Sequence, residues 1–575
     1  MVITTEHYAK PEPAPAAATG AAPRRGAGRP ARPEGQWALG QTEPLNHNEE
    51  FKRDDNPLNV RARIIDTYSR EGFDSIPSDD LRGRFRWMGL YTQRKPGIDG
   101  GRTASLEPHE LDDVHFMMRV RIDGGALSLA QLEAIADISR TYGRDSADIT
   151  DRQNIQFHWI RIEDVPAIWE RLEAVGLETT EACGDCPRVI LGSPVAGVAK
   201  GELVDPTAAI AEIKERFIGD PTLSNLPRKY KTSVAWHWDA IPEINDISFV
   251  GVEHPEHGPG FDVLVGGGLS TSAHLAVRLG AWVALEDVPA VWHAVTGFFR
   301  DYGYRRLRNK ARLKYLVADI GAEKIREILE RDYLDAPMID GPAAVAPDRP
   351  LDYVGVHEQA DGNRFVGFSP IAGRVSGMTL QHVADAARAA GSDRVRLTPL
   401  QKLLVLDIAP EKVDSLIAAI EPHGLIARAS TWRRGTLACT GLEYCKLAIV
   451  ETKARAATLV TRLEERLDGL ELDRPVSVGI NGCPNSCARI QTTDIGLKGQ
   501  IVTDADGNQV EGFQVHLGGG LGLDAGFGRK LRGHKVTAEE LSDYVERIVR
   551  NYADSKEPGE RFAQWAQRAP QEQLV

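Results

Sequence analysis

The sequence has little cysteine, no long apolar run and no excess of positive charge. Its 575 residues include only six cysteines, too few for a disulfide framework, so we expect a reducing compartment, the cytoplasm. No apolar run approaches the roughly eighteen residues of a membrane-spanning helix. The net charge of −13 argues against a general nucleic-acid binder. No strand–G-x-G-x-x-G–helix unit occurs, which excludes the usual dinucleotide-binding motif.

The first 55 residues are poor in large apolar side chains. They are rich in Ala, Pro, Gly and Arg. Such a composition buries too little surface to offset the entropy of ordering, so residues 1–55 are predicted to be a disordered tail.

Four of the six cysteines lie close together, in C-T-G-L-E-Y-C and N-G-C-P-N-S-C-A-R. They are Cys439, Cys445, Cys483 and Cys487. Four thiolates suit a soft metal centre, either zinc or an iron–sulfur cluster. Structural zinc sites favour tighter spacings than that of the first pair, so a cluster is the preferred interpretation. Zinc and four unrelated core cysteines remain as alternatives.

The chain carries an internal duplication. The stretch from Thr150 to Ile160 matches that from Thr398 to Ile408 at an offset of 248 residues. Each copy reads as strand, helix, strand, helix, an α+β unit of the ferredoxin-like kind. A second repeat follows each first one: D-I-S-F-V-G at 246–251 matches D-I-G-L-K-G at 494–499. The predicted fold is therefore α+β, a pseudo-twofold tandem duplication A-B-A′-B′.

The repeats divide the chain into four predicted domains after the tail. They are half-domain A (56–180), domain B (181–350), half-domain A′ (351–435) and domain B′ (436–575). Ala235 and Asp239 align with Cys483 and Cys487, so only domain B′ has the cysteines to hold a cluster. The prediction is one cluster per chain.

The two cysteine motifs resemble the cluster loops of the sirohaem-dependent sulfite and nitrite reductases. The resemblance extends from about residue 55 onward and is closest to the ferredoxin-dependent, assimilatory sulfite reductases of the actinobacterial type. It implies one [4Fe–4S] cluster on the four cysteines and a sirohaem whose iron shares Cys487. It further implies six-electron reduction of sulfite to sulfide.

A small anionic substrate needs cationic groups that neutralise it and donate protons. Arg119, Arg188, Lys229 and Lys231 match, residue for residue, the cations that line the distal haem face in sulfite-reducing members of this family. Lys229 and Lys231 point to the same side of an extended strand. The alternative for this K-x-K pair is a solvated basic edge.

Sirohaem carries eight carboxylates and needs many donors. Arg152, Gln153 and Asn154 in T-D-R-Q-N resemble one family anchor. Arg308 and Lys310, in a basic run from Arg306 to Lys314, are a second candidate. A solvated helix face explains that run equally well.

Three functions compete. The first is sulfite reduction with electrons from reduced ferredoxin, by a monomer that binds neither nucleic acid nor membrane. The second is assimilatory nitrite reduction, in whose plant-type members a K-x-N resembles the segment that here ends in Lys231. The third is a colourless scaffold with structural zinc.

The two remaining cysteines lie in T-E-A-C-G-D-C-P-R. A metal or dithiol role and a pair of buried thiols are both open for Cys183 and Cys186. The resemblance adds a third interpretation. In actinobacterial sulfite reductases with G-L-Y-T-Q-R, a tyrosine is joined to such a cysteine by a thioether beside the haem; here these residues are Tyr91 and Cys183.

Overall fold

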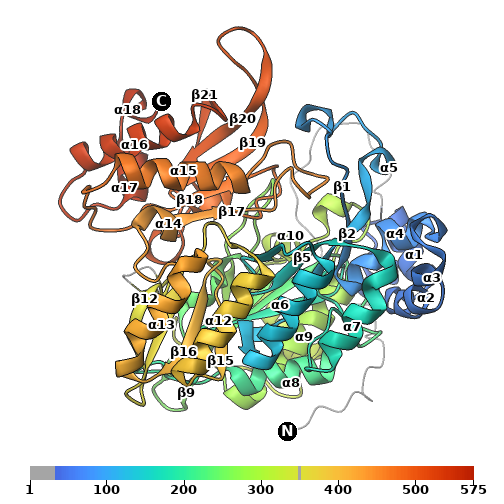
Figure 1. Ribbon diagram of the computed structural model, residues 1–575. Helices are drawn as coiled ribbons and strands as arrows, with labels where there is room; N and C mark the ends of the chain where they lie inside the picture. The colour runs from blue at the N-terminus through green and yellow to red at the C-terminus, as the bar shows by residue number, and fades with distance from the viewer. Residues whose placement is uncertain (1–32, 348–350) are drawn as a thin grey trace, which may run out of the picture.

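Figure 1 shows the computed structural model, which describes residues 33–347 and 351–575. Its strands form four sheets, two for the ferredoxin-like half-domains and one for each larger domain. The predicted α+β class and the tandem duplication are therefore confirmed.

The two half-domains have the same order of elements. Half-domain A comprises β1 (Leu90–Arg94), β2 (Asp112–Val120), β3 (Ala126–Ser128), α6 (Leu129–Tyr142), β4 (Ala147–Ile149), β5 (Ile155–Ile160) and α7 (Val165–Glu173). Half-domain A′ comprises β12 (Gly355–Glu358), β13 (Arg364–Phe368), β14 (Arg374–Val375), α12 (Gly377–Ala390), β15 (Arg394–Leu397), β16 (Leu403–Ile408) and α13 (Val413–Ile420). Each copy thus contains more strands than the two that the sequence pattern predicted.

The half-domains exchange edge strands. The short strand β14 of A′ completes the sheet β1-β2-β5-β4-β14, and β3 of A completes the sheet β12-β13-β16-β15-β3. Helices α6 and α12 lie side by side (Figure 1), and their apolar faces belong to one continuous core. The two copies therefore fold as one unit and not as two independent domains.

A buried glutamine occupies the same position, with the same hydrogen bonds, in both half-domains. Gln153 and Gln401 both have a left-handed backbone, with φ of 54° and 60°. The Gln153 amide pairs with the backbone N–H and C=O of Gly192, and Gln401 pairs in the same way with Ala438. Each glutamine thereby ties its half-domain to the strand that begins the following larger domain.

The two larger domains share one topology. In B the sheet order is β11-β10-β9-β8-β7-β6, and in B′ it is β17-β18-β19-β20-β21. The first three strands of each, β6–β7–β8 and β17–β18–β19, run parallel. Apolar cores beneath helices α9 and α11 in B, and beneath α15 and α16 in B′, hold the sheets.

Domain B contains β6 (Pro187–Gly192), α8 (Thr207–Phe217), β7 (Tyr230–Ala235), β8 (Ile247–His254), β9 (Gly258–Val265), β10 (Val277–Val283), α9 (Val288–Tyr302), α10 (Leu313–Ile320), α11 (Ala322–Asp332) and β11 (Ile339–Asp340). Domain B′ contains α14 (Thr431–Gly435), β17 (Thr436–Ala438), α15 (Lys453–Arg466), β18 (Val478–Asn481), β19 (Ile495–Thr503), β20 (Gln509–Leu517), β21 (Arg529–Thr537), α16 (Leu541–Ser555), α17 (Phe562–Arg568) and α18 (Gln571–Leu574).

The predicted disorder of residues 1–55 is wrong for their second part. Residues 1–32 lie outside the described residues, but helix α1 (His47–Asp54) begins at an Asn46 cap and buries Phe51. Averaging the composition over the whole segment obscured the few apolar anchors that this part contains. Three short helices follow before β1: α2 (Val60–Arg63), α3 (Ser69–Glu71) and α4 (Ser78–Arg82). A fourth, α5 (Pro108–Leu111), lies between β1 and β2.

Within residues 33–347 and 351–575, no helix combines the length and apolar character needed to cross a membrane.

Candidate functional site

The four clustered cysteines lie in two loops at one edge of the B′ sheet. Cys439 directly follows β17, and the loop with Cys483 and Cys487 follows β18. Because these two strands are parallel neighbours, their carboxyl ends meet at the same edge, where Cys439 N–H donates to Ile480 C=O at 3.1 Å. Gly441 has φ of 73°, and a Cβ there would lie 2.3 Å from Thr452 Oγ1. Only glycine fits this turn between the first two cysteines.

The four thiols influence one another electrostatically. Burial raises the pKa of Cys439 to about 12, with Cys487 and Cys445 adding to the rise. Burial also raises the pKa of Cys445 and of Cys483, and Cys487 contributes to both. Such mutual effects require proximity, so the loops bring the four sulfurs together. A bound cationic centre would instead favour the thiolates.

Backbone N–H groups point at these sulfurs. Gly482 N–H donates to Cys439 Sγ at 3.2 Å, and the N–H of Asn485 donates to Cys483. Hydrogen bonds to sulfur are among the features by which a protein tunes an iron–sulfur cluster. Among the described residues, no group of three or more His, Cys, Asp or Glu side chains is close enough to hold a single metal ion.

The cations predicted to bind the substrate converge from three segments. Arg119 lies on β2, Arg188 on β6, and Lys229 and Lys231 lie where β7 begins. Burial lowers the pKa of Lys229, and Lys231 and Arg188 add to the fall. Burial also lowers the pKa of Lys231, and Cys487 opposes this lowering. The lysines therefore lie near Arg188 and on the side of the cysteine predicted to bind both cofactors. Arg119 joins them through Cys183, to whose Sγ its Nε donates at 3.3 Å.

Lys231 and the nearby Arg152 lack enough negative charge around them. Burial lowers the pKa of Lys231 to about 7 and that of Arg152 to about 9, and neighbouring arginines add to both shifts. The Nη1 atom of Arg119 is buried without a hydrogen-bond partner. Buried charges are normally paired, so this arrangement calls for an anionic guest. A carboxylate-rich cofactor and an anionic substrate both fit that requirement.

Tyr91 and Cys183 are neighbours in this group. Burial raises the pKa of the Tyr91 phenol, and Cys183, with which it is hydrogen-bonded, adds to the rise. Burial also raises the pKa of Cys183, but Arg119 and Arg188 outweigh it and the net shift is downward. The pair therefore combines a thiol disposed to ionise with a phenol in contact with it. Cys186 differs, since burial raises its pKa and its Sγ donates to Cys183 C=O at 2.7 Å.

The residues predicted to bind sirohaem have different surroundings. Arg152 bonds Asn245 and Val189 C=O. The side-chain amide of Gln153 is hydrogen-bonded to the backbone of Gly192 and Leu397, and the side chain of Asn154 accepts a hydrogen bond from Ile122 N–H. Arg308 donates two hydrogen bonds to the Asp185 carboxylate. Lys310 is exposed, and its Nζ lies 4.5 Å from the centre of the Tyr315 ring. Of this set, Arg152 alone belongs to the group of buried cations near Lys231.

Two charged residues of this region, Arg86 and Asp185, were not predicted from the sequence. Burial lowers the pKa of Arg86, which also interacts electrostatically with Tyr91 and Arg188. The one feature of the sequence that could have indicated a role for Arg86 is its place in the motif that contains Tyr91. Asp185 has its pKa held below its usual range, because Arg308, Lys52 and Arg228 outweigh its burial. Its position inside C-G-D-C-P-R was visible, but its partners come from distant segments.

Two family models match the chain. The model described as the nitrite and sulphite reductase 4Fe-4S domain matches residues 183–337 and 431–575. The model described as the nitrite/sulfite reductase ferredoxin-like half domain matches residues 109–175 and 357–423. The chain belongs to the nitrite and sulphite reductase family. Each model matches twice, in agreement with the duplication.

Several relatives within the nitrite and sulphite reductase family are similar over nearly their full length. The sulfite reductases (ferredoxin) of Mycobacterium tuberculosis and Mycolicibacterium paratuberculosis are each 59% identical over 546 residues, 95% of this chain and 98% of theirs. An assimilatory ferredoxin-dependent nitrite reductase from Haloferax mediterranei is 34% identical over 88% of each chain. The structure of the Mycobacterium tuberculosis NirA protein superposes with a TM-score of 0.93 at 58% identity, covering 95% of this chain and all of that one.

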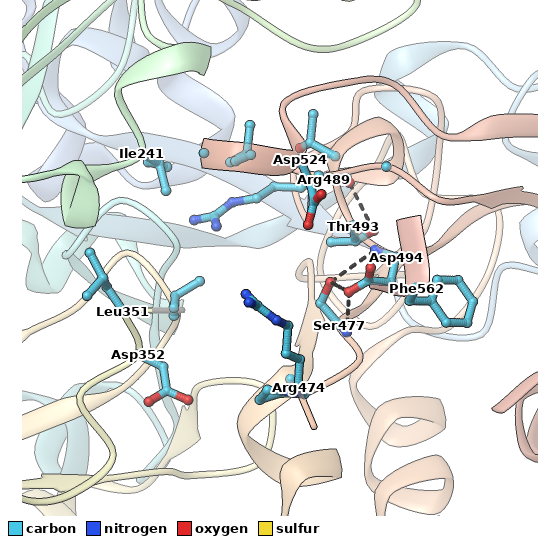
Figure 2. A pocket seen from close by; sticks show the side chains of 18 of the residues that line it. Ile241, Leu351, Asp352, Arg474, Ser477, Arg489, Thr493, Asp494, Asp524 and Phe562 are labelled. Atoms are coloured by element: carbon cyan, nitrogen blue, oxygen red, sulfur yellow. Dashed lines mark hydrogen bonds between the residues drawn. The ribbon is translucent and has the colours of Figure 1, made fainter. Parts of the chain in front are cut away.

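A cavity of about 270 Å³ lies on the side of the molecule that the duplication relates to the cysteine loops (Figure 2). Leu400, Ser477 and Asp494 line it, and at the offset of 248 residues they correspond to Arg152, Lys229 and Asp246. Asp239, the counterpart of Cys487, lines it too and accepts hydrogen bonds from Ser193 and Tyr353.

The charges of this cavity differ from those beside the cysteines. Asp246 is paired with Arg312, whereas its counterpart Asp494 is bonded to Ser477, and burial raises its pKa to about 6. The side chains of Arg474 and Arg489 point into the space (Figure 2), but the counterparts of Arg152 and Lys229 are uncharged. Among the described residues, the duplicate side therefore has neither the cysteines nor the full set of cations that lie beside Cys487.

Proposed function

We propose that this protein is a ferredoxin-dependent sulfite reductase. The convergence of Arg119, Arg188, Lys229 and Lys231 on the side of Cys487 carries the proposal, and the identity to mycobacterial sulfite reductases supports it. Cys439, Cys445, Cys483 and Cys487 would hold a [4Fe–4S] cluster, with Cys487 also a ligand of the sirohaem iron. When bound, the cluster and sirohaem supply the electron-transfer chemistry.

The chain's own residues bind the anion and supply protons. Sulfite, six electrons and seven protons give hydrosulfide and three waters, so several protons must reach the substrate oxygens. Lys231, whose pKa lies near 7, holds a proton that it can release at neutral pH. The guanidinium groups of Arg119 and Arg188 orient the anion.

Nitrite reduction is the second candidate, because family members with that activity share 34–36% of their residues with this chain. Sulfite is a dianion and nitrite a monoanion, so the cationic pair Lys229 and Lys231 favours sulfite. A second cation 4 Å away is worth up to about 4 kcal/mol at intermediate dielectric. We expect some nitrite turnover beside the main activity.

A visible spectrum of the purified protein tests the cofactor assignment. A sirohaem Soret band, together with an iron assay that gives about five iron atoms per chain, four for the cluster and one for the sirohaem, supports the proposal. Colourless, zinc-containing protein would refute it and favour a scaffold.

Reduced ferredoxin would dock on the open face of the B′ sheet. Lys498 and Lys535 lie opposite the same residue, Gln514, so they share a face, and Lys498 pairs with Asn481, which leads into the cysteine loop. Exposed Arg529, Lys530 and Arg532 lie on β21, the edge strand. This basic face suits a small acidic protein.

Salt and charge reversal should therefore weaken the reaction with ferredoxin. We expect K530E/K535E to lower kcat/KM for reduced ferredoxin about tenfold at low ionic strength, since the two charges steer association. Turnover with a small-molecule reductant should not change, and K324E, on α11 of domain B, is the control. An equal loss with both reductants would contradict docking on this face.

The contact between Tyr91 and Cys183 predicts a covalent bond in mature enzyme. Loss of two hydrogens to an oxidant such as dioxygen would join a ring carbon of Tyr91 to Cys183 Sγ. Mass spectrometry of digested protein should show the two peptides joined, lighter by two hydrogens and resistant to thiol reduction. C183A should abolish this product and C186A should retain it. Separate, unmodified peptides from active enzyme would contradict the bond.

A further inference from the structure

The chain segment that leads into β7 is held by an unusual set of hydrogen bonds. Each carbonyl oxygen of residues 224–227 accepts from a different side chain. The pairs are Trp87 Nε1 to Ser224 O (2.8 Å), Arg305 Nη2 to Asn225 O (2.9 Å), Lys52 Nζ to Leu226 O (2.9 Å) and Arg308 Nη1 to Pro227 O (3.5 Å). Two residues later comes Lys229, the first lysine of the anion site. The backbone that carries this site is thus fixed from behind.

Asp185 links the same cations to the other half of the site. Its buried carboxylate bonds Arg308 and lies 3.6 Å from Lys52 Nζ and 3.7 Å from Arg228 Nη1. Its backbone C=O accepts from Leu226 N–H at 2.9 Å. Because Asp185 lies between Cys183 and Arg188 in the sequence, it joins the loop of those residues to the segment before Lys229. The two anion-binding loops are thereby held in one arrangement.

The N-terminal segment supplies the outer support. Glu49 on α1 bonds both Lys52 Nζ (2.7 Å) and Arg305 Nη1 (2.9 Å). Glu34 C=O accepts from Arg305 N–H, and the Trp37 ring centre lies 3.8 Å from the Arg305 guanidinium carbon. Residues 34–52 therefore enclose the turn that carries Arg305. The side chains of Lys52 and Arg305 are 0% and 3% exposed, so water does not compete for these bonds.

These hydrogen bonds and ion pairs oppose the repulsion between Lys229 and Lys231. Lys229 and Lys231 are two residues apart at the start of β7, and each interacts electrostatically with Arg312, so like charges repel there. With no fixed backbone, the two lysines would move apart and the distance between their charges would grow. A rigid backbone keeps both ammonium groups on one small anion. The ion network behind the segment supplies that rigidity.

We propose that Lys52, Arg305, Arg308 and Asp185 are positioning residues for Lys229 and Lys231. This inference rests on the proposed function for its substrate, sulfite. It gives Arg308 a role different from cofactor binding and gives the N-terminal helix α1 a role in substrate affinity. None of the four contacts the substrate; they fix the backbone from which the two lysines extend.

The test uses K52M in the full-length holoenzyme. Amide hydrogen exchange followed by mass spectrometry should show about tenfold faster exchange in the peptide covering residues 224–232, the loss expected for one bond to a charged group. KM for sulfite should rise about tenfold while kcat changes less than twofold. K52R, which keeps a donor, should restore part of both. The matched control is K200M, an exposed lysine paired with Glu358, which should behave as wild type.

Two results would overturn the inference. One is a lower melting temperature with unchanged exchange at 224–232 and unchanged KM, which marks a network that only stabilises the fold. The other is faster exchange without any change in KM. If K52M does not fold, R305K is measured instead. This variant keeps the positive charge but loses the pair of hydrogen bonds that the Arg305 guanidinium donates to Asn225. If wild-type enzyme does not reduce sulfite, the proposed function fails, yet exchange at 224–232 still tests whether Lys52 fixes the segment.

Discussion

Replacing Cys487 by serine is expected to abolish sulfite turnover while the chain still folds. Cys487 is exposed, unlike buried Cys483, so its loss leaves no cavity in the B′ core. A serine hydroxyl is a hard ligand and a poor donor for iron in a cluster. By the family resemblance this one sulfur serves both cofactors, so the variant loses the link between them.

The measurement combines turnover, the visible spectrum and circular dichroism of C487S. We expect native secondary structure, an altered or absent Soret band and no sulfide. C186A is the matched control, because Cys186 is a buried thiol outside the four and should keep turnover. Wild-type activity in C487S would rule out the bridging role.

Replacing Lys231 by asparagine is expected to lower kcat/KM for sulfite by about 10²–10³-fold, the usual cost of removing one preorganised group that stabilises developing charge. Nitrite turnover should fall less, because a monoanion loses less attraction. K324N is the control for a lysine outside the site. An equal loss with both substrates would show that Lys231 supplies charge without selecting the substrate.

The same residue predicts a pH dependence. Burial and Arg152 lower the pKa of Lys231 to about 7, and a lysine is cationic only below its pKa. Sulfite affinity should therefore fall as pH rises through about 7. In K231R the charge persists at every such pH, so the part of the decline due to Lys231 should disappear. An identical pH profile in K231R would assign the decline to another group or to sulfite itself.

Much of this architecture follows from pattern alone. The repeat at an offset of 248 residues predicted two equivalent halves, and the structure gives matching sheets with Gln153 and Gln401 in the same left-handed conformation. The cysteine loops could be predicted because Gly441 and the turn-forming residues near Cys483 indicate tight turns of the backbone beside the sulfurs. The four candidate cations came from a resemblance and not from physics, since a lone arginine on a strand more often faces water.

Other features depend on contacts that no local pattern encodes. Strands β3 and β14 have three and two residues and join the sheet of the opposite half, so neither has a periodicity to detect. The basic run from Arg306 to Lys314 looked uniform, yet Asp185, over 120 residues away, binds Arg308, and Asp246 binds Arg312. The order of residues 33–55 likewise comes from long-range partners of Glu49 and Lys52.

The most direct measurement counts electrons. Under anaerobic conditions, reduced ferredoxin is mixed with sulfite and the purified enzyme, and ferredoxin oxidised and sulfide formed are both quantified. We expect six one-electron ferredoxins to be oxidised for each sulfide released. Oxidation of ferredoxin by nitrite with no sulfide formed from sulfite would contradict this expectation.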